Sequence, residues 1–83
     1  MNNLTCEYDS RNSFYNKALT FTEEGVLKLR SYNTIVCIIK NNKPIVYGTY
    51  SNTTLRHIKE FLKQNGFKAE TKQQILKDYS KEE

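Results

Sequence analysis

Few residues of this sequence could take part in chemistry, and two of them stand together. The chain's one histidine, His57, follows Arg56 in the stretch TYSNTTLRHIKEF. Nucleophilic catalysis would need a partner for that histidine, and Cys37 is the thiol that a Cys–His pair would use. However, Cys37 lies in the most apolar run of the chain, TIVCIIK, where a thiol is expected to be buried and inert. We predict no catalytic role for the pair, and His57 is either a packing residue or a contact residue.

The sequence also lacks the residue patterns of a metal site or of an acid–base catalytic site. A metal site needs several converging ligands, and one histidine with two distant cysteines does not supply them. The adjacent acids Glu23 and Glu24 precede Gly25, a pattern typical of a solvated hairpin loop. The sequence therefore predicts a protein that is not an enzyme and that holds no metal or cofactor.

The composition is that of one small globular domain. The chain has 83 residues, of which 37% are hydrophobic and 27% charged, with only three glycines and one proline. This length suits a single core and excludes a two-domain enzyme. Two cysteines are too few for a disulfide framework. No apolar run reaches the roughly 18 residues of a membrane helix and the N-terminus lacks a signal pattern, so we expect a cytoplasmic protein without membrane contact.

The hydrophobic pattern predicts an α+β domain over residues 13–80, with a four-stranded antiparallel β-sheet followed by two α-helices packed on one face (ββββαα). The expected strands are residues 14–21, 26–32, 34–40 and 45–50. The third of these, TIVCIIK, is apolar without interruption, which is typical of a central strand covered on both faces. Residues 1–12 are polar and aperiodic, so they are assigned to a flexible leader or one short edge segment, and residues 81–83 to a frayed C-terminus.

The second strand alternates clearly between two kinds of side chain. Leu27, Leu29 and Ser31 fall on one face, and Lys28 and Arg30 fall on the other. Such alternation is typical of an antiparallel strand that buries one face. We expect the face with the leucines to enter the core.

An amphipathic helix is expected over residues 53–64, and a second, shorter helix from Thr71. The apolar side chains of the first helix fall within one sector and would pack on the sheet: Leu55, Ile58, Phe61 and Leu62. Arg56, Glu60 and Lys63 fall on the opposite side. Because Glu60 follows Arg56 by four residues and precedes Lys63 by three, we expect this polar row to form ion pairs within itself.

Nucleic-acid binding is one function that the charge permits. The chain has a formal net charge of +4, and between residues 52 and 81 seven Lys or Arg stand against three acids. Two basic helices could contact phosphates, as many DNA-binding modules do. Lysines spread along amphipathic helices are also typical of ordinary solvated surfaces, and no RNA-recognition or helix-turn-helix pattern is present. A basic nucleic-acid-binding module is therefore the alternative hypothesis.

Protein binding is the preferred hypothesis. Tyrosine is enriched in protein interfaces because its ring buries a large area while its hydroxyl keeps a polar contact. Tyr47 and Tyr50 stand at the last strand, and Arg56, Lys59 and Lys63 lie in the first helix. We expect the arginine to contact a carboxylate or phosphate and the tyrosines to provide contact area. These five residues are the predicted binding site.

Two stretches, SYNTIVCII and YSNTTLRHIKEFLKQNGF, resemble a small uncharacterised protein family of phages and mobile elements in low-GC Gram-positive bacteria. The matching residues are Ser31, Tyr32, Thr34, Val36, Tyr50, Ser51, Thr53, Thr54, Arg56, His57, Ile58, Phe61 and Leu62. The resemblance extends over about residues 13–80 and brings no catalytic role with it. It implies a phage accessory protein.

Small phage accessory proteins are often counter-defence factors that block a host nuclease complex, anti-CRISPR proteins among them, so the resemblance implies an inhibitor of a host defence protein, such as a CRISPR effector complex. Because this chain is basic, it cannot act as an acidic DNA mimic. It would have to occupy a protein surface of its target or compete through its own positive face.

Overall fold

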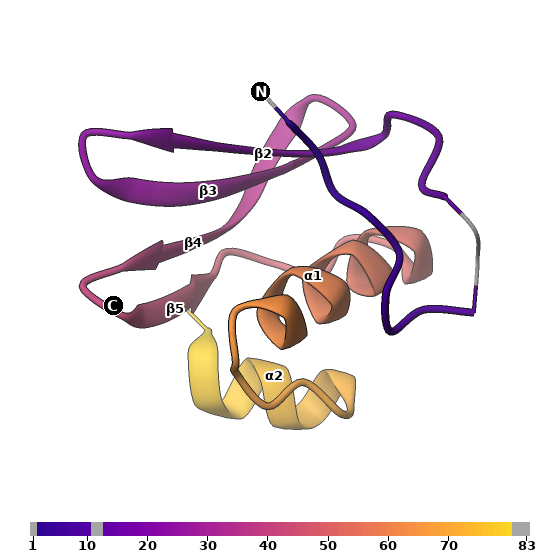
Figure 1. Ribbon diagram of the computed structural model, residues 1–83. Coiled ribbons are helices and arrows are strands. Elements are labelled where there is room, and N and C mark those ends of the chain that lie inside the picture. The colour runs from indigo at the N-terminus through magenta and orange to yellow at the C-terminus, as the bar shows by residue number, and fades with distance from the viewer. Residues whose placement is uncertain (1, 11–12, 81–83) are drawn as a thin grey trace.

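The computed structural model describes residues 2–10 and 13–80. Within these residues, five strands form one antiparallel sheet in the order β1-β2-β3-β4-β5, and two helices follow (Figure 1). The elements are β1 Asn2–Asn3, β2 Ala18–Glu23, β3 Val26–Ser31, β4 Thr34–Lys40, β5 Lys43–Val46, α1 Asn52–Gln64 and α2 Lys72–Tyr79. The structure confirms the predicted α+β class, its antiparallel sheet and its two helices.

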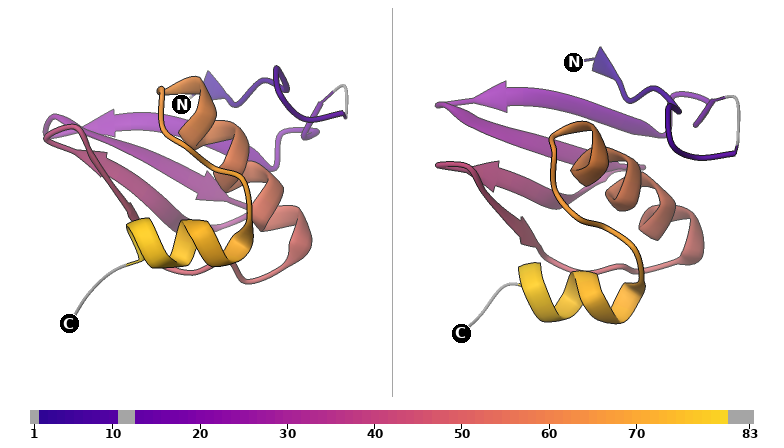
Figure 2. Two further views of the ribbon diagram at one scale, coloured as in Figure 1. Left: turned by 90° about the horizontal axis from the view of Figure 1, so that it is seen from below. Right: turned by 60° about the horizontal axis from the view of Figure 1, so that its bottom comes forward.

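One face of the sheet is covered by the helices. Leu29, Cys37 and Val46 point from β3, β4 and β5 to this face and are buried with Ile58 of α1 and Ile75 of α2 in one core. Figure 2 shows α1 crossing the sheet and α2 lying beside β5. The opposite face of the sheet carries neither helix. The alternation predicted for the second strand is confirmed, because its leucine side enters this core.

β4 differs from the strand expected for its sequence. The register between β3 and β4 skips one residue of β4, Val36, and so contains a β-bulge. The bulge places the consecutive side chains of Val36 and Cys37 in the core, while Ile35 and Ile38 lie on the opposite face. Since the helices cover one face only, the prediction that this strand is covered on both faces is wrong for this chain.

β2 begins later than predicted. It starts at Ala18, because Tyr15 and Asn16 take positive φ angles of 52° and 66° and form a turn. Phe14, which the sequence assigns to the strand, precedes that turn and packs in the core. Its ring lies edge-on to the ring of His57, with 4.6 Å between the centroids. Phe14 therefore contributes to the hydrophobic core although it lies outside the strand.

β5 is shifted toward the N-terminus relative to the strand predicted at residues 45–50, since it runs from Lys43 and ends at Val46. Asn41 and Asn42, with φ angles of 53° and 64°, form the two-residue turn that joins β4 to β5. Pro44 is part of β5 itself. As β5 is the last strand of the sheet, a residue without an N–H group is tolerated there.

Both helices begin with a residue whose hydroxyl group caps the helix N-terminus. Ser51 caps α1 by accepting the N–H group three residues further on, and Thr71 caps α2 in the same way. After α1, Gly66 takes a positive φ of 85° and Phe67 donates its N–H to the carbonyl of Leu62 at 2.9 Å. Neither of these two helices, the helices of the described residues, is long and apolar enough to cross a membrane.

The N-terminal segment is part of the domain. β1 pairs with the edge of β2, and Leu4 is buried in the core. Residues 5–10 then run beside α1 (Figure 1). The domain boundary proposed at residue 13 thus moves to residue 2, and β1 is the short edge segment that was the alternative to a flexible leader. Residues 11–12 of the expected leader and the expected frayed end at 81–83 lie outside the described residues.

Candidate functional site

The five predicted site residues lie on two different surfaces. Arg56, Lys59 and Lys63 follow one another along α1 and line a shallow hollow of about 260 Å³, which we call the α1 flank. Tyr47 and Tyr50 line a second hollow, of about 580 Å³, on the face of the sheet that carries no helix. We call this second surface the open face; its lining is Val26, Lys28, Ile35, Ile38, Lys40, Tyr47 and Tyr50. The two hollows share no residue, so the predicted site is divided.

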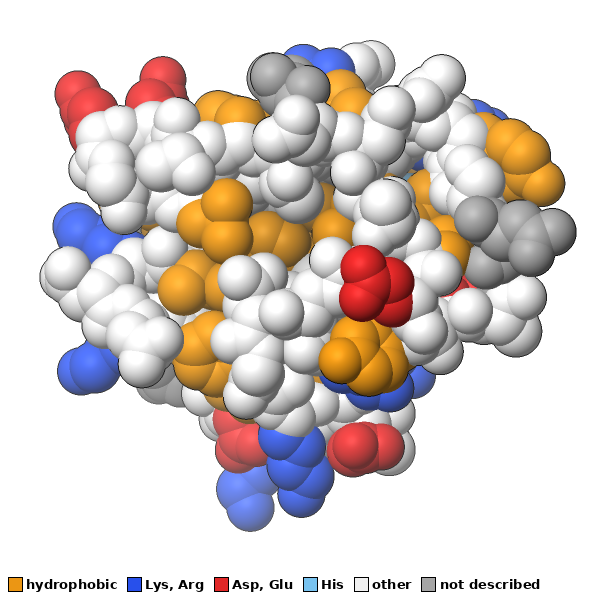
Figure 3. Space-filling model, in the orientation of Figure 1, with side chains coloured by type: hydrophobic (Ala, Val, Ile, Leu, Met, Phe, Trp, Pro, Cys, Tyr) orange, Lys and Arg blue, Asp and Glu red, His pale blue; other side chains and the backbone are white. Residues whose placement is uncertain are grey.

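The basic residues of the helical half do not form one continuous surface. Lys72 and Lys77 of α2 are exposed beside Glu70 and Asp78. Figure 3 shows the result at the lower edge of the molecule, over α2, where Lys and Arg side chains are mixed with Asp and Glu. A duplex backbone would require a run of cations that acids do not interrupt. The lining of the α1 flank has three cations against two acids, Asp9 and Glu60, so a small excess of positive charge remains there.

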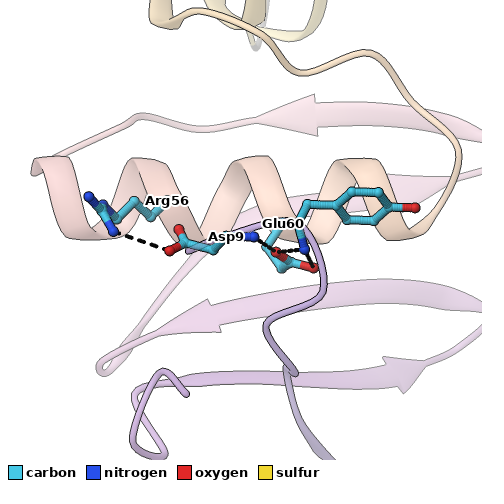
Figure 4. A network of polar contacts seen from close by, with 4 residues as sticks. Asp9, Arg56 and Glu60 are labelled. Carbon is cyan, nitrogen blue, oxygen red and sulfur yellow. Dashed lines mark hydrogen bonds and ion pairs between the residues drawn. The ribbon is translucent and has the colours of Figure 1, made fainter. Parts of the chain in front are cut away.

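Glu60 is not a member of the exposed row in which the sequence placed it. Its side chain is only 1% exposed, and its carboxylate accepts the backbone N–H groups of residues 7–9, each at 2.9 Å. Figure 4 shows the bond from Asp9. Gln64 also donates its side-chain amide to this carboxylate. Consecutive N–H groups that converge on one anion form a nest. The predicted ion pairs of Glu60 with Arg56 and Lys63 are thus wrong.

The N-terminal segment also supplies the partner of Arg56. Its Nη1 donates to the Oδ1 atom of Asp9 at 3.1 Å, while 43% of the arginine side chain remains exposed (Figure 4). Lys59 and Lys63 are half-buried and make no ion pair within residues 2–10 and 13–80. The flank therefore presents one arginine held by an acid and two lysines whose charges the described residues do not neutralise.

The open face combines an apolar floor with cations. Ile38 lies at the floor, nearly buried, with Ile35 and Val26 beside it. Lys28 donates to Glu23 at 2.7 Å, which lowers the pKa of that carboxyl and raises the pKa of the lysine. Lys40 is exposed and pairs with no acid among the described residues. Positive charge therefore prevails on this face.

Arg30 belongs to the open face as well. It follows Lys28 by two residues on β3, and it stands opposite Ile35 of β4. Its Nε atom is buried and has no hydrogen-bond partner within the described chain. A buried donor without an acceptor lowers stability, so this nitrogen costs the fold free energy.

Tyr50 is held in an unusual backbone conformation. Its φ angle is 55°, in the left-handed region that an aromatic residue rarely takes. The ring lies over Gly48, where an added Cβ would meet the ring carbons at 3.2 Å. The side chain nevertheless remains 66% exposed. The missing side chain of Gly48 leaves the space that the Tyr50 ring occupies.

His57 lies in the interior, between α1 and β3. Its Nδ1 is 2.8 Å from the Oγ atom of Ser31, which lies 3.0 Å from the Oγ1 atom of Thr54. Ser31 and His57 have the contact of a nucleophile and its base, but both side chains are at most 2% exposed, so a substrate does not reach them. Of the two roles left open for His57, the structure supports packing.

Cys37 is also buried, and its thiol is unreactive. Burial raises the pKa of its thiol to about 12, so the thiol remains protonated at neutral pH. Within residues 2–10 and 13–80, no three His, Cys, Asp or Glu side chains converge as metal ligands would.

Comparison with known families places the chain. A family of unknown function, DUF8033, matches residues 2–77. The chain belongs to this family. The DUF8033 match begins at β1 and includes both hollows, so the N-terminal segment is part of the family's domain. No curated protein and no solved structure matches the chain. Membership of DUF8033 agrees with the resemblance to an uncharacterised family and assigns no activity.

Sequence reasoning missed three cations of the open face. The alternation in β3 places Lys28 and Arg30 on the side away from the core, and Lys40 ends the apolar run of β4. The positions of these three cations could be read from the sequence. They indicate a binding surface only once it is known that no helix of the described chain covers that side of the sheet. Nothing in the sequence indicated that residues 7–9 would bind Glu60.

Proposed function

We propose that this DUF8033 protein acts by binding, and that its α1 flank docks on an acidic surface of a protein partner. The observation that supports this is the state of Lys59 and Lys63. They lie one helical turn apart on the same side of α1, and they have no ion-pair partner among the described residues. Glu60 lines the same hollow, but its carboxylate accepts backbone N–H groups of the N-terminal segment and forms an ion pair with neither lysine.

The backbone that supports the α1 flank is also held in place. Residues 7–9 are tied to α1 through Glu60, and Asp9 holds Arg56 at 3.1 Å. A partner therefore meets side chains whose supporting backbone is already in position, which lowers the entropy cost of binding. Charge complementarity of this kind steers association and selects the partner.

The partner that we propose is a host defence protein, such as a CRISPR effector nuclease complex, which the protein would inhibit in the cytoplasm of a bacterial host. The resemblance to proteins of phages and mobile elements supports this choice. A basic protein does not imitate DNA, so inhibition would come from occupying an acidic protein surface that the nuclease needs.

Charge reversal on the flank tests the proposal. The wild-type protein is used to capture partners from the lysate of a low-GC Gram-positive bacterium, and a captured protein is purified and titrated by calorimetry. The double substitution Lys59→Glu, Lys63→Glu is expected to weaken this binding at least about tenfold, because like charges then face each other. Nuclease assays with the purified target report inhibition.

A matched control makes the test specific. Lys72→Glu, Lys77→Glu introduces the same change of charge on α2, where both lysines are exposed. This control should retain the partner. If the α2 control loses the partner as completely as the flank variant, or if the flank variant binds as tightly as the wild type, the proposed docking surface is wrong.

A further inference from the structure

We propose that the open face is a second binding site, and that its ligand is single-stranded nucleic acid. Phosphates would lie at Lys28, Arg30 and Lys40, and a base would stack on the ring of Tyr50. This site is independent of the α1 flank, since the two hollows share no residue. Four features of the open face point to this ligand.

The first feature is the charge. Three cations lie on two adjacent strands, and among the described residues only Glu23 pairs with one of them. Lys28 and Arg30 stand two residues apart on one strand, about 7 Å along it. That separation is comparable with the distance between consecutive phosphates of an extended strand. The cations could therefore follow a nucleic-acid backbone from one phosphate to the next.

The second feature is the unpaired donor of Arg30. Its buried Nε finds no acceptor among the described residues, although such donors are nearly always paired. A guanidinium presents its N–H groups as a planar fork that fits two oxygens of one phosphate. A phosphate bound in this fork would supply the missing acceptor once the side chain turns and brings Nε to the surface.

The third feature is the ring of Tyr50. Tyr50 takes a positive φ, as Tyr15 and Tyr32 also do, and this conformation costs a tyrosine free energy that it would not cost glycine. Here the strained backbone holds a ring that is mostly exposed and supported from below by Gly48. A fixed, exposed aromatic ring is the platform on which proteins stack unpaired bases. Tyr47, also exposed on this face, offers a second ring.

The fourth feature is the apolar floor. An uninterrupted apolar strand is normally covered on both sides, yet the side of β4 with Ile35 and Ile38 has no covering element in the described chain. A second copy of this protein is a poor cover, because its three cations would meet the same three cations. Duplex DNA is also a poor ligand, since its bases are already stacked and cannot lie on Tyr50.

Fluorescence anisotropy with labelled oligonucleotides of about ten nucleotides tests the proposal. The probes are oligo(U) and oligo(dT), which separate RNA from DNA as the source, with duplex DNA and a polyglutamate peptide as competitors. With three phosphate contacts, raising the salt from about 50 mM to about 200 mM should weaken binding roughly 20-fold. Tight binding of either single strand, with weaker competition by duplex and peptide, supports the site.

Substitutions then locate the binding. Tyr50→Leu removes the ring and should weaken binding about tenfold or more, whereas Tyr50→Phe should restore it. The double substitution Lys28→Ala, Lys40→Ala should also reduce the slope of log affinity against log salt, by about 0.7 for each phosphate that is no longer neutralised. The matched control is Lys59→Ala, Lys63→Ala on the α1 flank, which changes the net charge equally and should bind as the wild type does. Circular dichroism verifies the fold of each variant.

Three results would overturn the proposal. The first is no binding of either single strand at low salt. The second is an equal decrease of affinity in the flank control and in the double variant of the open face, because binding would then follow net charge alone. The third is a polyglutamate peptide that competes as well as the oligonucleotides while Tyr50→Leu leaves affinity unchanged, because the face would then be a site for acidic peptides.

Discussion

The α1 flank and the open face each carry three cations, but the molecule treats these cations differently. On the flank, the N-terminal segment gives Asp9 to Arg56 and holds Glu60 by three backbone N–H groups. On the open face, Lys28 has an acid, whereas Arg30 keeps a buried nitrogen without a partner in the described chain. The flank is supported by its own chain, while the open face contains groups that the described fold does not satisfy.

This difference separates stability from binding. Groups that are paired within the chain contribute to the free energy of folding, and their removal should destabilise the protein. Groups that are strained or unpaired lower stability and persist where they serve another purpose. Substitutions on the two surfaces should therefore change the free energy of unfolding in opposite directions.

The largest effect is expected from Glu60→Ala. The substitution leaves three N–H groups of residues 7–9 without their acceptor, so the free energy of unfolding should fall by about 2–4 kcal/mol. Urea unfolding measures the decrease, and hydrogen exchange should show faster exchange at residues 7–9. Glu70→Ala, which removes an exposed acid before α2, is the control and should change stability by less than about 0.5 kcal/mol. Equal effects of the two substitutions would mean that the segment is not held by Glu60.

A smaller decrease is expected from Ser31→Ala, which alters the interior between the two surfaces. Ser31 contacts both His57 and Thr54, and its removal leaves a buried ring nitrogen without that hydrogen bond. We expect the free energy of unfolding to fall by about 1–3 kcal/mol, measured in urea. Ser10→Ala, near the surface of the N-terminal segment, changes the same side chain and serves as the control. A decrease no larger than that of the control would show that the Ser31–His57 contact does not stabilise α1 on the sheet.

The parts of this fold that could be predicted depend on local signals. Ser51 and Gly66 mark the ends of α1 through their own conformational preferences, and alternation over residues 26–31 assigns the faces of β3. These signals are carried by neighbouring residues, so the sequence shows them directly.

The parts that could not be predicted depend on contacts between distant residues. The bonds from residues 7–9 to Glu60 join positions more than 50 residues apart, and no periodicity encodes such a contact. The helical wheel placed Glu60 on the polar side, which would be right for an isolated helix on a sheet. The division of the predicted site into two surfaces has the same cause, because it depends on where Tyr50 lies relative to α1 in the folded chain.

Arg30→Met should change stability in the opposite direction. Methionine keeps most of the apolar contact and removes the unpaired nitrogen, so the free energy of unfolding should stay equal or rise by up to about 1 kcal/mol. The same variant should bind single-stranded oligonucleotides more weakly. Lys28→Met, a substitution on the same strand that breaks the ion pair with Glu23, is the variant with which Arg30→Met is compared. A clear destabilisation by Arg30→Met would show that the guanidinium serves the fold, and the contrast between the two surfaces would then fail.

A small effect on stability is expected from Asp9→Asn. This variant tests the difference between the α1 flank and the open face most directly. The asparagine keeps the backbone N–H bound to Glu60 but removes the charge that holds Arg56, a pair whose arginine is largely solvated. Stability should fall by only about 0.2–1 kcal/mol, and less at high salt. Because the flank then loses a negative charge, its affinity for an acidic partner should rise, while oligonucleotide binding at the open face stays the same. Asp78→Asn on α2 changes the net charge equally, so an equal gain in both variants would assign the effect to net charge rather than to the release of Arg56.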